Sequence, residues 1–246
     1  MKKTFIVFIS LLVLVACDKA KEIIDEVLPG LTEEQVVEGL KSALVVGTDT
    51  ATYSLHQENG YYNDPLVKIL LPDDTKALIE NIELIPGGAS LLNDLIVRMN
   101  RAAEDAATEA TPIFVNAISS MTISDGVTIL KGADDAATQY LKSKTYESLV
   151  ATFQPKIAAS LDKPLIGGVS ASETWEQLRS LNNSIANTLV GQLAGLTTIN
   201  YSLDEHVTRK GLDGLFVYVA QEEKAIRHDP LARVTEILKK VFGAID

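Results

Sequence analysis

The chain has 246 residues, a net charge of −11 and 46% hydrophobic residues. This length is sufficient to bury the core of one large domain or two small ones. The acidic balance argues against nucleic-acid binding, which needs a basic surface to neutralise phosphates. It also means that electrostatic attraction alone cannot hold the chain on anionic lipid headgroups.

The first 16 residues have the pattern of a secretory signal peptide. Lys2 and Lys3 are followed by an apolar run from Phe5 to Ala16. This run is shorter than the roughly 20 residues that a membrane-spanning helix needs. Removal of residues 1–16 would delete both lysines and change the net charge from −11 to −13.

The motif Leu14-Val15-Ala16-Cys17 resembles a lipobox, in which the cysteine is acylated and becomes the new N-terminus. Cys17 is the only cysteine, so the chain cannot form an internal disulfide. The alternative is an ordinary signal peptide with an incidental cysteine.

We favour a signal peptide over residues 1–16 and a lipidated tether over residues 17–30. Acyl chains on Cys17 would then anchor the protein to a bacterial membrane, with its domain facing the periplasm. The choice between inner and outer membrane stays open.

The folded domain is expected to begin at Thr32-Glu33-Glu34-Gln35, a capping box. Apolar residues then recur at helical spacing as far as Ala51. Gly39 and Gly47 within this helix indicate the close approach of a neighbouring helix. A loop over residues 59–72 carries Tyr61 and Tyr62, which we expect to cover the edge of the core.

The clearest predicted helix runs from about Ser90 to Ala110. One face of this helix is apolar, and Asn100 and Glu104 border it, so both are expected to be partly buried. Short helices are expected to follow Pro112 and Thr122, and another to follow Asp134-Asp135. Acids at that last position suit a helix N-terminus better than a metal site, because no His or Cys accompanies them.

The C-terminal half is also predicted to be helical. The expected helices are Thr145–Phe153 and Pro155–Leu161, separated or kinked at Pro155; a helix from Ser170 through Leu189; a long helix from Ser202 to about Arg227; and a closing helix after Asp229-Pro230. Residues 197–201 are the only strand-like fragment, too short for a sheet. The sequence therefore predicts an all-α fold, a single multi-helix, bundle-like domain over residues 31–246.

Several separated motifs resemble one known bacterial family. They are the run Met99–Tyr140, then Leu212–Phe216, Glu222-Glu223, and Ile226–Pro230. Together they resemble the family called domain of unknown function 4197, over roughly Leu31 to Gly243. The resemblance implies an exported, helical bacterial envelope protein. It provides no agreed activity and no catalytic residues to transfer.

The candidate functional residues are acids at the borders of apolar stripes. Glu104, Glu222 and Glu223 could act as a base or hold a polar ligand, with Arg98 or Arg101 as partners. We favour the alternative that these groups form a structural ion pair between the two long helices.

Several catalytic motifs are missing from the sequence. Residues 168–172 lack the final glycine of a nucleophile elbow, and the Ser160-x-x-Lys163 pattern lacks its companion motifs. The three histidines do not form a zinc motif, so no metal or cofactor is expected.

We therefore predict a non-enzymatic binding or structural module that binds a partner protein or a small ligand. The alternative is a hydrolase-like enzyme that uses the core-border carboxylates. A polar pocket where Glu104, Glu222 and an arginine converge would favour the enzyme. An exposed apolar patch of several hundred Å² would favour a partner protein.

Overall fold

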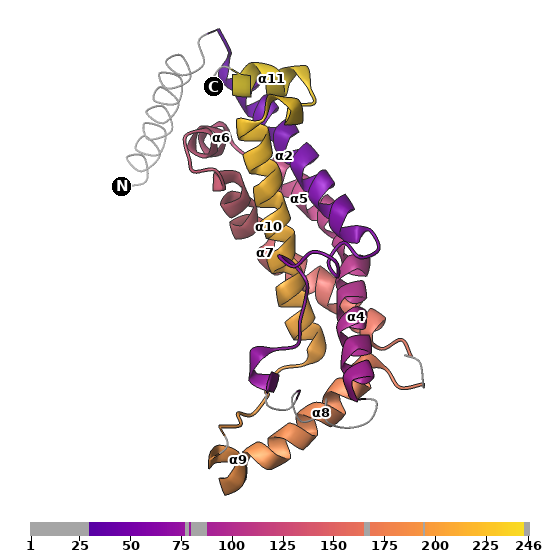
Figure 1. Cartoon of the computed structure of the whole chain (residues 1–246). Coiled ribbons are helices and arrows are strands. Elements are labelled where there is room, and N and C mark those ends of the chain that lie inside the picture. Colours follow the sequence, from indigo (N-terminus) through magenta and orange to yellow (C-terminus); the bar gives the residue numbers. More distant parts are fainter. Residues whose placement is uncertain (1–29, 77–78, 80–87, 165–167, 194, 244–246) are drawn as a thin grey trace, which may run out of the picture. The chain divides into compact units, whose positions relative to one another are not determined.

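A computed structural model describes residues 30–76, 79, 88–164, 168–193 and 195–243 (Figure 1). Within these ranges the chain is helical and contains no strand, apart from one isolated bridge between Pro164 and Ser170. The predicted all-α fold is confirmed. The predicted signal peptide and Cys17 lie outside the described residues.

The described helices, with the labels of Figure 1, are α2 (Glu33–His56), η1 (Asp73–Thr75), α4 (Gly88–Ala107), α5 (Ala110–Ser119), α6 (Ile123–Leu130), α7 (Ala136–Leu161), α8 (Ala171–Ala186), α9 (Leu189–Leu193), α10 (Leu203–His228), η2 (Pro230–Ala232) and α11 (Glu236–Gly243). Among them, no single helix has the length and apolar character of a membrane span. Only α5 and α6 together meet that test, and the chain bends by 106° between them.

Three predicted helix starts are confirmed by their hydrogen bonds. At α2, the Thr32 amide donates to Gln35 Oε1 over 3.0 Å, and the Gln35 amide donates to Thr32 Oγ1. Reciprocal capping boxes also open α6, at Thr122, and α8, at Ser170. Each such cap satisfies amides that have no partner inside the helix and contributes about 1 kcal/mol.

Of the two predicted alternatives at Pro155, separate helices are wrong, because α7 is one continuous helix of 26 residues that contains this proline. Pro155 removes the amide that would bind the carbonyl of Ala151. Both residues are exposed, so water can bind that carbonyl instead. The buried side chains of Phe153 and Ile157 continue on the inner side of the helix and hold it together.

Two other predicted elements differ at their ends. Asp229 does cap a turn, since its side chain accepts from the Leu231 amide, but the turn is only a 3-10 helix. The closing helix α11 begins later, at Glu236. The helix predicted to run through Leu189 stops at Ala186, and α9 follows.

The chain divides into two compact units. Unit 1 holds Met1–Ala51, Thr111–Thr145 and Tyr218–Asp246, and unit 2 holds Thr52–Ala110 and Tyr146–Val217. Three of the four boundaries fall within α2, α7 and α10, and the fourth lies at the first residue of α5.

In unit 1 the core lies between the N-terminal helix α2 and the C-terminal helices. Gly39 lets α11 approach closely, since a Cβ there would lie 2.6 Å from Val241 Cγ2. A Cβ on Gly47 would lie 3.4 Å from the Cβ of Glu222 on α10. These contacts confirm the predicted role of both glycines.

In unit 2, α4 contacts α8, and α8 contacts α9 (Figure 1). The predicted inner face of α4 is buried, including Leu95 and Met99. Gly211 brings α10 close to α4, since a Cβ there would lie 3.4 Å from Ala103 Cβ. Tyr61 is fully buried, as expected for a residue that covers the core, and donates its hydroxyl proton to the Gly211 carbonyl over 2.8 Å.

Candidate functional site

Glu104, in unit 2, is a buried carboxylate that is only 3% exposed. One oxygen accepts from the amides of Tyr61 and Tyr62, at 3.2 and 3.4 Å. The other accepts from Arg101 Nη1 at 2.5 Å. The carboxylate therefore anchors the loop after α2 to α4, as a buried charge must be paired and hydrogen-bonded to be tolerated.

Arg101 is also fully engaged. Its Nη2 donates to Glu58 at 3.0 Å and to Asn59 at 2.9 Å. His56 Nδ1 donates to the backbone carbonyl of Glu104 over 2.9 Å. These contacts tie the end of α2 and the following turn to α4, which is a structural role.

Glu223, in unit 1, is the second buried carboxylate. It accepts from the amides of Ala137 and Thr138 at 2.9 and 2.8 Å, and from Thr138 Oγ1 at 2.8 Å. Arg227 adds two hydrogen bonds, from Nε at 3.1 Å and Nη2 at 2.8 Å. The Glu223 carboxylate thus caps the first turn of α7, where a negative charge is favoured.

The expected ion pair between the two long helices is wrong. Each buried acid pairs with an arginine of its own helix, Arg101 with Glu104 on α4 and Arg227 with Glu223 on α10. Arg227 was not predicted as a partner, although its position four residues after Glu223 fits helical ion-pair spacing. Each carboxylate is instead held to a distant part of the chain by backbone amides. The spacing of residues in the sequence does not reveal such contacts.

The remaining predicted residues are less constrained. Glu222 is half-buried in unit 1, next to Gly47, and burial raises the pKa of its carboxyl. In the described part of the chain it makes no hydrogen bond or ion pair. Arg98 lies half-buried on α4 in unit 2.

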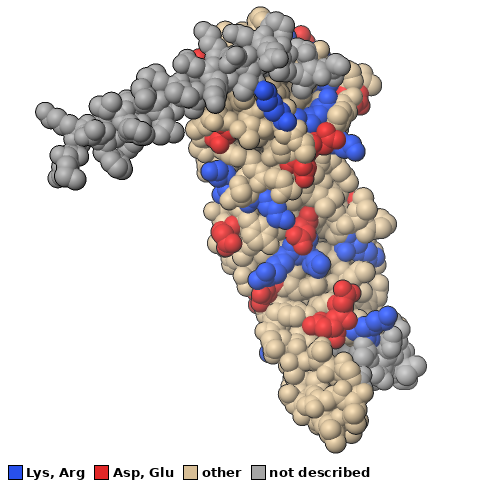
Figure 2. All heavy atoms as spheres, turned by 90° about the vertical axis from the view of Figure 1, so that its left-hand side faces the viewer, with Lys and Arg blue, Asp and Glu red and all other residues tan. Residues whose placement is uncertain are grey.

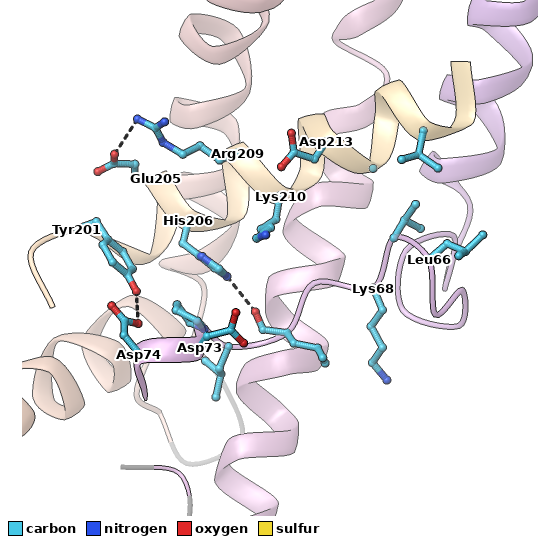
Figure 3. Close-up of a pocket in the computed structure, with 16 residues that line it drawn as sticks. Leu66, Lys68, Asp73, Asp74, Tyr201, Glu205, His206, Arg209, Lys210 and Asp213 are labelled. Atoms are coloured by element: carbon cyan, nitrogen blue, oxygen red, sulfur yellow. Dashed lines mark hydrogen bonds and ion pairs between the residues drawn. The ribbon is translucent and has the colours of Figure 1, made fainter. Parts of the chain in front are cut away.

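Unit 2 contains a groove of about 840 Å³ (Figure 3). One wall is the segment Leu66–Asp74, and the other is the face of α10 from Glu205 to Val217, together with Tyr201. We call this cavity the groove. Its volume lies within the range typical of small-ligand sites.

The wall Leu66–Asp74 has no regular secondary structure before η1 and is held by side chains. Asn100 on α4 binds both polar groups of Ile69, accepting from its amide at 2.9 Å and donating to its carbonyl at 2.8 Å. From the other side, His206 Nε2 donates to the Leu70 carbonyl over 2.9 Å (Figure 3). The groove is therefore pre-formed.

Two titratable groups of the groove have shifted pKa values. Burial lowers the pKa of His206, so its imidazole is neutral at pH 7. Its Nε2–H group donates a hydrogen bond to the backbone carbonyl of Leu70. Burial, together with the 2.5 Å hydrogen bond to Asp74, raises the pKa of the Tyr201 hydroxyl.

A different surface of unit 2 is marked by the absence of charge. No Lys, Arg, Asp or Glu occurs between Arg179 and Asp204, which we call the uncharged segment. It exposes large apolar side chains, and Figure 2 shows this lower end of unit 2 free of charged residues. The exposed fractions are 52% for Leu181, 41% for Ile185, 73% for Leu189, 74% for Val190 and 80% for Leu193. We call these five residues the apolar patch.

The backbone beneath the apolar patch is fixed by amide side chains. Asn182 is buried and donates to the Thr197 carbonyl over 2.8 Å. Asn183 binds both polar groups of Ile199, at 2.8 and 2.9 Å. Gly191 packs so tightly that a Cβ would lie 2.1 Å from the carbonyl oxygen of Ile185. The patch is thus a preorganised surface.

Neither the groove nor the apolar patch was predicted from the sequence, although the patch has a signal there. The predicted apolar stripe of α8 is buried at Trp175 but exposed at Leu181 and Ile185. A run without any charged residue in an otherwise acidic chain could have identified this surface. The groove had no such signal, because its walls lie more than 100 residues apart in the sequence.

No group of three or more His, Cys, Asp or Glu side chains suited to a metal ion occurs in the part of the chain that the structure describes. Asp134, one of the two acids considered for a metal, instead binds His228 over 2.8 Å.

The sequence of the chain matches a known protein family. The sequence model of the family described as "Protein of unknown function (DUF4197)" matches residues 30–243. The chain belongs to this family. The DUF4197 match includes residues of both compact units and every residue of the groove and the apolar patch. No solved structure matches this DUF4197 protein.

Proposed function

We propose that this DUF4197 protein is a lipid-anchored protein of the bacterial envelope that binds a partner protein through the apolar patch. The observation that carries the proposal is the exposure of five large apolar side chains on a rigid, uncharged surface. Large apolar side chains that stay exposed close together in the sequence are typical of interaction sites.

The chemistry of the uncharged segment favours a protein over a bilayer. Helices that lie in a membrane interface carry Lys and Arg beside their apolar face, often with Trp or Phe. The uncharged segment contains no Lys or Arg. The hydroxyl of its one aromatic residue, Tyr201, donates a hydrogen bond to the carboxylate of Asp74. Asn187, Thr188 and Gln192 are exposed around the patch and form the uncharged polar rim typical of protein interfaces.

The alternative, a hydrolase that uses core-border carboxylates, has little support. Glu104 and Glu223 each accept three or more hydrogen bonds from fixed donors. These donors hold both carboxylates in buried, paired positions, as expected of structural groups. We assign both residues to stability.

The anchor proposal rests on Leu14-Val15-Ala16-Cys17 and on the lack of any other cysteine. Mass spectrometry of the N-terminal peptide of the mature protein tests it. We expect the peptide to begin at Cys17 and to carry acyl chains. A mature chain that begins downstream, or an unacylated Cys17, would refute the anchor without affecting the partner proposal.

Native mass spectrometry of the protein purified from its own envelope tests the partner. We compare the wild type with Leu193→Asp and with Leu231→Asp, a control in unit 1 that is 89% exposed. A protein that co-purifies with the wild type and the control, but not with Leu193→Asp, is expected. Equal recovery with both variants, or binding only to lipid or to another copy of the chain, would contradict the proposal.

A further inference from the structure

The groove is a second binding site candidate, independent of the apolar patch. Most of its charged groups already have partners. Arg209 pairs with Glu205 at 3.1 Å, and Tyr201 donates to Asp74. Lys68 Nζ lies 3.7 Å from the centre of the Tyr62 ring, in a cation–π contact.

Two charged groups of the groove have no partner in the part of the chain that the structure describes. In the described ranges, neither Lys210 nor Asp73 makes a hydrogen bond or ion pair with another side chain. Lys210 reaches from α10 towards the opposite wall, on which Asp73 lies (Figure 3). The groove therefore presents one free positive and one free negative charge, from opposite walls.

The remaining surface of the groove is apolar or backbone. Leu66 and Leu70 line it and are 70% and 56% exposed. Val217 adds a further exposed aliphatic side chain from α10. In the described ranges, the amides of Leu70 and Leu71 make no hydrogen bond.

We infer that the groove binds short peptides with free termini and aliphatic side chains. The peptide carboxylate would contact Lys210, and its ammonium group would contact Asp73. Its aliphatic side chains would cover the exposed leucines, and its carbonyls would accept from the open amides. A peptide is the ligand class that supplies opposite charges, apolar side chains and hydrogen-bond acceptors in one extended molecule.

The experiment uses the full chain in detergent and synthetic peptides of alanine and leucine, two to four residues long. Each peptide is made with free termini, with an amidated C-terminus, or with an acetylated N-terminus. Binding is followed by calorimetry and by the fluorescence of Trp175, the only tryptophan, whose ring lies 6.2 Å from that of Tyr201. Concentrations up to about 10 mM detect even millimolar affinities.

We expect a free-ended peptide to bind and Lys210→Gln to weaken it by about fivefold to tenfold, the size of one charge-assisted contact. The same substitution should not affect the C-amidated peptide, because the contact is already absent. Asp73→Asn should show the matching behaviour with the N-acetylated peptide.

Lys224→Gln and Asp162→Asn remove exposed charges outside the groove and serve as controls. Failure of every peptide to bind would overturn the inference. So would equal binding of capped and free peptides, or equal losses in the controls. None of these results would affect the partner proposed for the apolar patch, because that partner is tested at Leu193.

Discussion

At the scale of single residues, the buried carboxylate of Glu223 makes the sharpest prediction. Glu223→Gln removes the charge that balances Arg227 and turns a donor towards the α7 amides. We expect a loss of about 3 kcal/mol in the free energy of unfolding, typical of a broken buried pair. Urea unfolding followed by circular dichroism measures it.

The matched control for that measurement is Glu38→Gln, an exposed acid on α2 in the same unit. It should change stability by no more than about 0.5 kcal/mol. If Glu223→Gln cost no more than this control, the carboxylate would be dispensable to the fold, and a functional role for it would return to consideration.

Glu222, the neighbouring acid, should respond in the opposite direction. Burial raises the pKa of its carboxyl in the folded state, so the folded protein holds that proton more tightly than the unfolded chain. Ionisation of Glu222 therefore costs stability, and the cost appears as the pH rises above the unfolded pKa. Glu222→Gln should stabilise the protein slightly at pH 7.

The pH dependence separates this mechanism from better packing. The difference between Glu222→Gln and the wild type should disappear in unfolding experiments below about pH 4, where the carboxyl is protonated in both states. A gain in stability that is the same at pH 4 and pH 7 would mean that desolvation of the charge is not its cause.

At the scale of helices, α7 tests how a proline is tolerated in the middle of a helix. Pro155→Ala restores a hydrogen bond to the Ala151 carbonyl, and both positions are exposed, so no side-chain packing is lost. After allowance for greater freedom of the unfolded chain, we expect a gain of about 1–2 kcal/mol. Thermal unfolding measures it.

Pro112→Ala is the control for Pro155→Ala. Pro112 lies in the first turn of α5, where a missing amide breaks no helical hydrogen bond. This substitution should leave stability unchanged or lower it slightly. A destabilised Pro155→Ala variant would indicate that the proline fits a local backbone geometry that alanine does not adopt.

At the scale of the whole molecule, its charge controls what can approach the apolar patch. At neutral pH two copies of this acidic chain repel each other, which favours a different partner over self-association. Near the isoelectric point, which is about 4.8 for the whole sequence and lower once Lys2 and Lys3 are removed, this repulsion vanishes. We expect self-association there, measurable by sedimentation of the detergent-solubilised chain, and its loss in Leu193→Asp.

The behaviour of Leu231→Asp distinguishes this from general precipitation near the isoelectric point. Leu231 is more exposed than any residue of the apolar patch but stands outside it. If Leu231→Asp suppressed self-association as strongly as Leu193→Asp, the apolar patch would not be the contact surface.

The sequence was informative wherever local rules decide the structure. Capping residues such as Thr122 and Ser170 predicted helix starts, and apolar spacing predicted the buried faces of α4 and α10. The position of Glu223 beside an apolar stripe also indicated its burial. Its principal partners could not be predicted, because the Ala137 and Thr138 amides are 86 and 85 residues away. The exposure of Leu181 depends in the same way on tertiary packing.

Asn100 and Glu104 stand four residues apart on α4, and between them they hold Tyr61, Tyr62 and Ile69. One turn of α4 therefore sets the distance between the two places at which the irregular segment is bound, at Tyr61-Tyr62 and at Ile69. A residue inserted between Asn100 and Glu104 would rotate one of these side chains by about 100° around the helix axis relative to the other. The hydrogen bonds of that side chain to the irregular segment would then be lost, although no existing side chain had changed. Evolution can lengthen the exposed turn at Asn63 more freely than it can lengthen this one turn of α4.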